Sequence, residues 1–165
     1  MKTLNQAVGA ASLNTRITRA GEVVTNATFL VNTRGKKAIR MTLPEGNTLW
    51  TAKADGVLIN ARVDGNELIL PLPPTKDPNR YRSLEVRYGG TAENPAKVSI
   101  GPPVLSAPMT VAEWKVTGDN HLTPIGGNVK PLEMAVTENG FDQVSGEFRY
   151  LAGVLFLLLL SLIHI

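Results

Sequence analysis

The chain has 165 residues, 43% of them hydrophobic and 19% charged, which is the composition of a folded domain and excludes an intrinsically disordered chain. It has no cysteine, which excludes a disulfide scaffold, a thiolate metal site and a cysteine nucleophile. The net charge is only +3, the basic residues are scattered and aromatic residues are 5%, so we expect no nucleic-acid partner. The densest basic cluster, Arg34-Gly35-Lys36-Lys37, is interpreted as a solvated hairpin tip.

The first part of the chain contains three segments in which apolar and polar residues alternate. They cover residues 13–18, 23–31 and 38–43. The apolar faces of the first two coincide if Arg19 pairs with Val23 across a three-residue loop. Alternation of this kind is typical of strands with one buried face, so we expect three strands here.

Two Asp-Gly dipeptides, Asp55-Gly56 and Asp64-Gly65, lie between the next alternating segments. Asp-Gly at this position is a strong signal for a two-residue hairpin loop, because a type I′ turn needs positive φ at both central residues. Two such loops predict a three-stranded meander in which Ala54 faces Val57 and Val63 faces Asn66. Its apolar face would carry Trp50, Ala52, Ala54, Val57, Ile59, Ala61, Val63, Leu68, Leu70 and Leu72.

The remaining signals are proline-rich connections and further short strands. Residues 73–78 form a stiff connection that cannot join a ladder. Residues 84–88 alternate cleanly until Gly89-Gly90, where we expect the strand to end, and residues 97–100 and 111–116 are weaker strand candidates. Short strands of this kind predict an all-β fold, an antiparallel β-sandwich of Ig-like or Greek-key type.

The domain organisation follows from where these signals begin and fade. We expect the sandwich over residues 8–116, then a linker or the start of a further β domain over 117–149. Residues 150–159 are expected to be a truncated apolar segment that could enter a membrane, although spanning takes about 20 apolar residues. Residues 160–165 are also the translation of CTG TCT CTT ATA CAC ATC, a transposon-end sequencing adapter, so we interpret them as an artefact of library preparation. The alternative is that they form a genuine short tail.

A search for chemistry finds no catalytic arrangement. The two histidines are His121, interpreted as an exposed loop residue, and His164, which falls in the adapter segment. The chain has no Gly-x-Ser-x-Gly elbow, no phosphate loop and no dinucleotide fingerprint. The carboxylates lie at turns or on polar faces, as Glu45, Asp55, Asp64, Asp77 and Glu85 show. We therefore assign no catalytic, cofactor-binding or metal residue, expect no cofactor, and predict that the chain is not an enzyme.

The aromatic residues leave two interpretations open. Trp50, Tyr81, Tyr88 and Trp114 could form a platform on which sugar rings stack, or they could belong to the core. Trp50 and Tyr88 fall on the apolar faces of their segments, which favours burial. The platform requires two of them to emerge coplanar on the surface.

Several segments form a pattern along the chain: Leu43-Pro44-Glu45-Gly46, Leu49-Trp50, Asp55-Gly56, Leu68-Ile69-Leu70-Pro71-Leu72 and Leu84-Glu85-Val86-Arg87-Tyr88. Together they resemble a recurrent module of large, uncharacterised extracytoplasmic proteins of environmental bacteria. The proline-rich stretch before Glu113-Trp114 is similar to the crossing into that group's next sandwich. The match covers roughly residues 20–116. The resemblance implies a β-sandwich in an exported, membrane-anchored protein and carries over no functional residue.

Two functions remain from the sequence. The favoured one is a non-catalytic β-sandwich module, a spacer or interaction domain, on the extracytoplasmic side of the bacterial cell envelope. Its membrane contact would be the C-terminal apolar run, and its partners other envelope proteins or glycans. The alternative is an accessory domain of a larger secreted enzyme, which could bind sugars in the manner of carbohydrate-binding modules.

Overall fold

The structure is a computed structural model and describes residues 6–126. The chain divides into two units, Met1–Leu122 and Thr123–Ile165, and the following description concerns the first. Every helix or strand in the described residues is a β-strand, so the all-β prediction is confirmed. The expected linker beyond Gly126, the apolar segment 150–159 and the adapter segment 160–165 lie outside the described residues.

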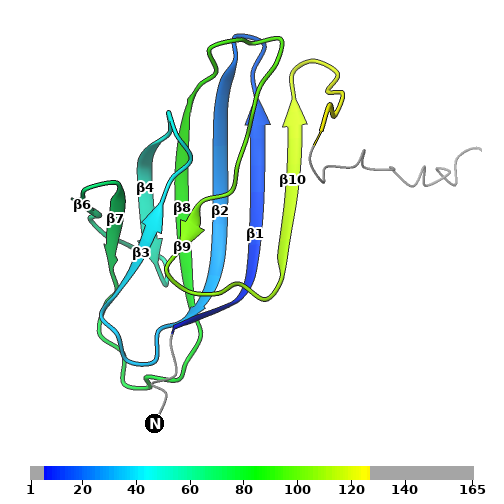
Figure 1. Ribbon diagram of the computed structural model, residues 1–165. Helices are drawn as coiled ribbons and strands as arrows, with labels where there is room; N and C mark the ends of the chain where they lie inside the picture. Colours follow the sequence, from blue (N-terminus) through cyan, green and yellow to red (C-terminus); the bar gives the residue numbers. More distant parts are fainter. Residues whose placement is uncertain (1–5, 127–165) are drawn as a thin grey trace, which may run out of the picture. The chain divides into compact units, whose positions relative to one another are not determined.

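The larger sheet has six strands in the order β10-β1-β2-β8-β4-β5 (Figure 1). Neighbouring strands run antiparallel except β1 and β10, which pair in parallel, whereas the sequence predicted antiparallel strands throughout. A parallel pair needs a long crossover, and here the chain passes through both sheets between its two members. The strands are β1 (Ala7–Ile17), β2 (Glu22–Asn32), β4 (Thr48–Ala54), β5 (Val57–Leu58), β8 (Arg82–Thr91) and β10 (Ala112–Gly118).

The smaller sheet has four strands in the order β6-β7-β3-β9, all antiparallel. In Figure 1, β3 passes in front of β4 and β9 passes in front of β8, so the two sheets form the layers of a sandwich. The strands are β3 (Ala38–Thr42), β6 (Arg62–Asp64), β7 (Glu67–Pro71) and β9 (Val104–Leu105).

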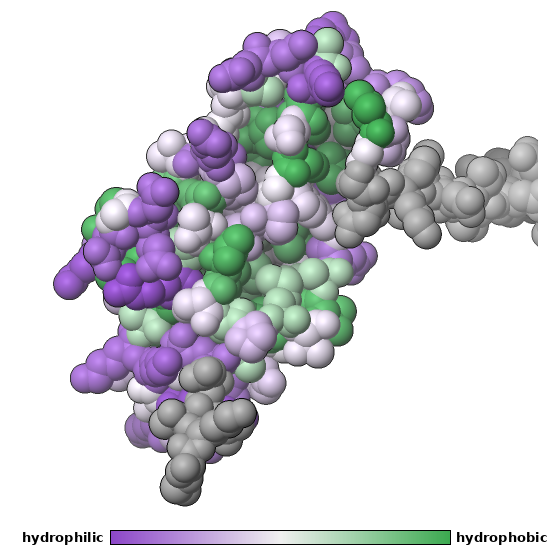
Figure 2. Space-filling view, viewed as in Figure 1, coloured by the Kyte–Doolittle hydropathy of each residue, from purple (hydrophilic) through white to green (hydrophobic). Residues whose placement is uncertain are grey.

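The core lies between the two sheets and is built by alternate residues of each strand. Phe29, Leu84 and Leu70 are fully buried, as expected for residues on the inner face of a pleated sheet. Much of the core was predicted from alternation: Leu13, Ala27, Phe29, Val31, Ile39, Met41, Ala52, Ala54, Leu70, Leu72, Leu84, Val86 and Tyr88. Figure 2 shows the side of the smaller sheet that faces away from the core. Hydrophilic side chains cover much of it, with hydrophobic areas among them.

In the hairpin of β1 and β2, the predicted residues face the core, but the loop lies at other residues than predicted. Thr15 faces Thr25 and Ile17 faces Val23, so the apolar sides of β1 and β2 coincide. The loop begins earlier than predicted, because the Thr18 N–H donates to the Glu22 carbonyl at 2.9 Å. Gly21 follows the tight turn with φ of 87°, the left-handed conformation that a bulged three-residue loop requires.

The predicted meander is correct at its first turn and wrong at its second. Ala54 pairs with Val57, and Asp55 and Gly56 both have positive φ, as in a type I′ turn. At the second turn Asp64 pairs with Glu67, so Val63 faces Leu68 and not Asn66. The loop there starts at Gly65, whose positive φ of 62° at the first central position fits a type II′ turn.

The middle strand of the meander is also divided between the two sheets. Val57–Leu58 pairs with β4 in the larger sheet, and Arg62–Asp64 pairs with β7 in the smaller one. Residues 59–61 cross between the layers and close this side of the sandwich. Val57 and Val63, predicted to share a buried face, are therefore 59% and 78% exposed at the rim.

Three other predictions at the end of the sandwich need correction. β8 does not stop at Gly89-Gly90 but continues to Thr91, paired on one side with the beginning of β2. No strand forms at residues 97–100, and the two-residue strand β9 was not predicted. The candidate at 111–116 is real, but it extends to Gly118, past the predicted boundary at residue 116.

Within residues 6–126 the structure contains no helix of the length and hydrophobicity needed to span a bilayer.

Candidate functional site

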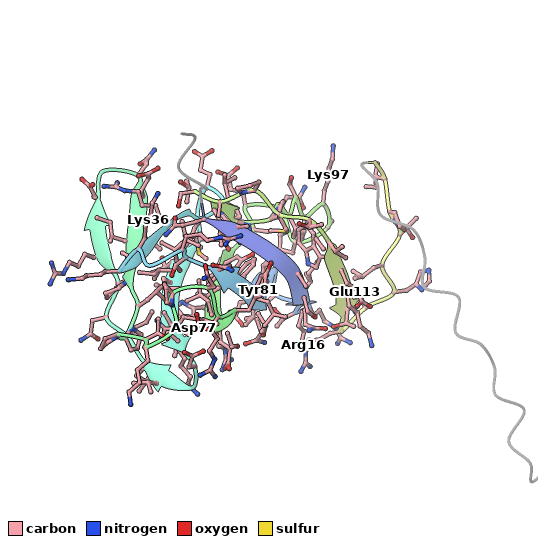
Figure 3. The ribbon with its side chains drawn as sticks, turned by 90° about the horizontal axis from the view of Figure 1, so that it is seen from below. Arg16, Lys36, Asp77, Tyr81, Lys97 and Glu113 are labelled. Atoms are coloured by element: carbon pink, nitrogen blue, oxygen red, sulfur yellow. The ribbon has the colours of Figure 1, made fainter. Side chains whose placement is uncertain are left out.

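The most distinctive surface of the described residues is the outer face of the six-stranded sheet around Trp50. The side chains of β2, β4 and β8 that do not enter the core point to this side, and most of them are exposed. We call the set formed by Asn26, Thr28, Trp50, Thr51, Lys53, Glu85 and Arg87 the Trp50 patch. Arg16 and Lys97 project from opposite sides of the sandwich in Figure 3, and the Trp50 patch belongs to the side of Arg16.

Trp50 reaches this face because β4 contains a bulge. The pairing with β8 shifts between Leu49, which faces Tyr88, and Thr51, which faces Arg87. Trp50 is the extra residue, and an inserted residue redirects its side chain relative to simple alternation. The prediction that Trp50 shares the buried face of Ala52 and Ala54 is therefore wrong: Trp50 is 51% exposed.

Gly89 provides the space in which the indole lies. A Cβ atom at Gly89 would stand 2.8 and 2.9 Å from Cη2 and Cζ2 of Trp50, and it would also overlap the carbonyl oxygen of Val23. The benzene edge of the indole thus rests over β8, where other residues would place a side chain. A half-exposed aromatic ring held against a rigid strand is a preorganised contact surface.

The guanidinium of Arg87 lies over the indole on the same side of the sheet. Its guanidinium carbon is 5.6 Å from the centroid of the Trp50 ring, a cation–π distance. The structure shows no salt bridge from Arg87 to a carboxylate in residues 6–126. Within residues 6–126, the charge of Arg87 therefore interacts with an aromatic ring and not with a carboxylate.

A shallow, open depression of about 320 Å³ adjoins this pair and is lined by Arg87 but not by Trp50. Within it, Lys53 and Glu85 are direct cross-strand partners in the β4–β8 ladder. The side chains of Ala27 and Val86 are buried on the inner face, so the groups that face solvent are hydroxyls, an amide and charges. The lining residues are Asn26, Ala27, Thr28, Thr51, Lys53, Glu85, Val86 and Arg87.

The other aromatic residues do not join this patch. Tyr88 is 1% exposed in the core, as predicted. Trp114 is half-buried on β10 and donates its Nε1–H to Thr15 Oγ1 at 2.9 Å. Tyr81 is 51% exposed but precedes β8 and packs toward Gly9, whereas Trp50 lies over Gly89 near the far end of that strand. A platform of two aromatic rings requires a coplanar, exposed pair. Residues 6–126 contain no such pair.

A buried polar network lies beneath Trp114. The Thr15 and Thr25 hydroxyl oxygens are 2.7 Å apart, and both residues are 2% exposed. Burial raises the pKa of the Tyr88 phenol. The Tyr88 hydroxyl has no hydrogen-bond partner among the described residues.

The carboxylates with displaced pKa values connect strands. Burial alone would raise the pKa of Asp55, but hydrogen bonds from the Arg82 side chain and the Ser83 N–H outweigh it and lower that pKa. The pKa of Asp119 is lowered by the Arg16 side chain, 2.8 Å away, and by the Arg19 N–H. Both carboxylates therefore have structural partners that explain their shifts.

The remaining residues considered from the sequence are dispersed. His121 is exposed in the segment after β10, as predicted. Arg34-Gly35 is exposed as predicted, but it is not a hairpin tip, because β2 and β3 lie in different sheets and the turn connects the two layers. Asp64 and Glu67 both accept hydrogen bonds from Arg40 on the surface of the smaller sheet. Among residues 6–126, no group of three or more histidine, aspartate or glutamate side chains is placed to hold a metal ion.

Sequence reasoning missed the Trp50 patch because it depends on one bulge. The only local signals were Gly89-Gly90 in an otherwise regular strand and the tryptophan itself. Glycine inside a strand indicates either a bulge or a close approach, and here it indicates a close approach by Trp50.

No protein-family model and no curated protein matches this chain. Solved structures share part of its backbone path. The M1 zinc metallopeptidase from Deinococcus radiodurans is 22% identical over 54% of this chain, with a TM-score of 0.46. Aminopeptidase A from Legionella pneumophila, in complex with aspartic acid, is 17% identical over 53%, with a TM-score of 0.43. The aligned part spans 21% and 11% of those two proteins, respectively.

Proposed function

We propose that this chain is a non-catalytic, Ig-like β-sandwich module of a larger bacterial protein, exported and anchored at the cell envelope. Its role is that of an interaction domain, and the Trp50 patch is its binding face. The observation that carries the proposal is the exposure of Trp50 by the β4 bulge, with the guanidinium of Arg87 beside its ring. Bulges commonly redirect side chains at functional sites.

Two further observations support a binding role over a catalytic one. Asp55 and Asp119, whose pKa values are lowered, are both hydrogen-bonded to arginines that connect strands. Glu85, the carboxylate in the Trp50 patch, is exposed and faces Lys53 across the ladder. Catalytic acids are usually found where burial or a like charge displaces their pKa.

The absence of cysteine from this chain makes a direct test simple. Thr28→Cys places the only thiol of the chain in the Trp50 patch, and Lys97→Cys places one on the opposite side of the sandwich as a matched control (Figure 3). The parent protein, labelled in parallel, gives the background from any cysteine outside this chain. Each variant would be made in the native protein, in its own cells, and treated with a membrane-impermeant maleimide. An extracytoplasmic module predicts labelling of the Lys97→Cys variant in intact cells.

An occupied binding face further predicts slower labelling of the Thr28→Cys variant in intact cells than in purified protein. The Lys97→Cys variant should react equally in both. No labelling of either variant without lysis would contradict the proposed location. Equal labelling of the Thr28→Cys variant in both preparations would contradict an interaction through this face.

A further inference from the structure

We propose that the ligand of the Trp50 patch is an acidic polysaccharide, with a sugar ring on the indole of Trp50 and a sugar carboxylate on Arg87. This inference rests on the proposed function and names the ligand class of the same face. Three properties of the patch carry it: a preorganised exposed ring, a polar and open depression, and an excess of positive charge.

The ring supplies the apolar contact. Trp50 is 51% exposed although its benzene edge rests over Gly89 and the Arg87 guanidinium lies over its ring, so part of the indole remains open to a ligand. The C–H-bearing face of a sugar ring is flat and apolar, and an aromatic face can cover it while the hydroxyls stay in water or reach polar neighbours. The position of the indole is set by the backbone of two strands, so little conformational freedom is lost on binding.

The depression supplies groups that can hydrogen-bond a hydroxylated ligand. Hydroxyl, amide and carboxylate groups come from three adjacent strands, β2, β4 and β8. They are exposed or partly exposed, so sugar hydroxyls can replace their water without entering an enclosed pocket. The groups are Asn26, Thr28, Thr51 and Glu85.

The charge balance favours an acidic sugar. Lys53 and Glu85 are cross-strand partners and offset each other, which leaves Arg87 as the net charge of the depression. In residues 6–126 Arg87 has no carboxylate partner, and its planar guanidinium is suited to binding a carboxylate with two hydrogen bonds. A carboxylate next to the stacked ring would complement this charge.

The same features disfavour a folded protein as the partner. Protein interfaces bury clusters of apolar and aromatic side chains at their centre. The apolar lining residues of the depression, Ala27 and Val86, turn their side chains into the core. The exposed leucines of the same face, Leu30 and Leu58, do not line the depression. One aromatic ring beside a polar depression matches the alternating apolar and hydroxyl surfaces of a sugar chain more closely.

The proposal is tested by affinity electrophoresis of the purified full chain in native gels containing polygalacturonate or alginate, with neutral dextran as the comparison. Acidic gels should retard the chain, and dextran should not. Trp50→Ala keeps every charge but removes the ring, and we expect it to weaken binding about tenfold. Trp50→Phe, which keeps an aromatic face, should lie between the two. Thermal melting checks that each variant is folded.

Two arginine variants and one aromatic control complete the experiment. Arg87→Gln should weaken binding several-fold, and Arg87→Lys should recover only part of it, because lysine keeps the charge without the planar fork. Tyr81→Ala removes a tyrosine that is as exposed as Trp50 but lies off the patch, so it should bind as the parent does.

Three outcomes would overturn the proposal. They are the absence of retardation in both acidic gels, equal retardation by dextran, and retardation that survives Trp50→Ala, which would indicate simple attraction between a basic chain and a polyanion. None of these outcomes changes the maleimide result, so failure of the ligand assignment and failure of the proposed function are distinguishable.

Discussion

Arg82 donates a hydrogen bond from Nε to Oδ2 of Asp55 at 2.8 Å, although the two residues are 27 positions apart. Asp55 occupies the type I′ turn between β4 and β5, and Arg82 is the first residue of β8. The same carboxylate accepts from the Ser83 N–H at 3.0 Å, and the Arg82 guanidinium also donates to the Pro73 carbonyl. Arg82 is 4% exposed, so the turn residue neutralises a buried cation.

We expect Asp55→Asn to lower the free energy of unfolding by about 3 kcal/mol, near the lower end for breaking a buried ion pair, because the Asp55 side chain is 33% exposed. Asparagine tolerates positive φ, so the turn itself is retained. Asp64→Asn is the matched control: its carboxylate pairs with Arg40 on the surface, and the loss should be below about 1 kcal/mol. Urea unfolding measures both, and equal losses would contradict a special role for Asp55.

The lowered pKa of Asp55 also predicts how stability depends on pH. The group has a lower pKa in the folded than in the unfolded state, so its contribution is fully present above the unfolded value of about 4. It is lost as the pH falls from there through the folded pKa, because the unfolded state then binds more protons. The drop in urea midpoint from pH 6 to pH 3 should be smaller in Asp55→Asn than in the parent chain. An unchanged drop would show that other carboxylates account for it.

Replacing Gly56 with valine should destabilise the fold. Its φ is 79°, and nothing lies within 4 Å of a Cβ atom placed there, so the penalty comes from the backbone conformation alone. We expect Gly56→Val to lower the free energy of unfolding by about 1–3 kcal/mol. Gly101→Val is the control, because Gly101 has the same open space without positive φ. If the two variants melt at the same temperature, strain at this turn is not significant.

Thr15 should be necessary for the stability of the β1–β10 pair. It accepts from Trp114 Nε1 at 2.9 Å and is 2% exposed, so Thr15→Val leaves the indole N–H without this partner. We expect a loss of about 1–3 kcal/mol. Thr28→Val, on the exposed face of the neighbouring strand, should change stability by less than about 0.5 kcal/mol. Hydrogen exchange of the β10 amides would show whether that strand opens first in Thr15→Val.

The strands and their buried faces could largely be predicted from the sequence. The alternation in β1, β2, β3 and β8 identified the inward side chains of each, including Thr15, Phe29, Met41 and Tyr88. Alternation is a strong signal because the side-chain period of a strand is two and only one face is buried here. The Asp55-Gly56 turn was predictable for a similar local reason, since few residues adopt positive φ twice in succession.

The candidate site could not be predicted in this way. A bulge changes the face of every residue on one side of it, and β4 has one between Leu49 and Thr51. Simple alternation therefore placed Trp50 in the core. The second Asp-Gly pair was misread for a different reason: Gly65 alone permits a type II′ turn, which leaves Asp64 in the strand opposite Glu67.

The sequence by itself determined the all-β class, the inner face of most strands and the first tight turn, because these depend on residues within a few positions of one another. Only the tertiary structure decided which strands became neighbours beyond the hairpins joined by short loops. The parallel pairing of β10 with β1, the crossing at residues 59–61 and the contact of Asp55 with Arg82 all join segments whose local patterns do not specify a partner. The exposure of Trp50 belongs to the same group, because it arises where β4 adjusts its register to β8 and the absent side chain of Gly89 leaves room for the indole.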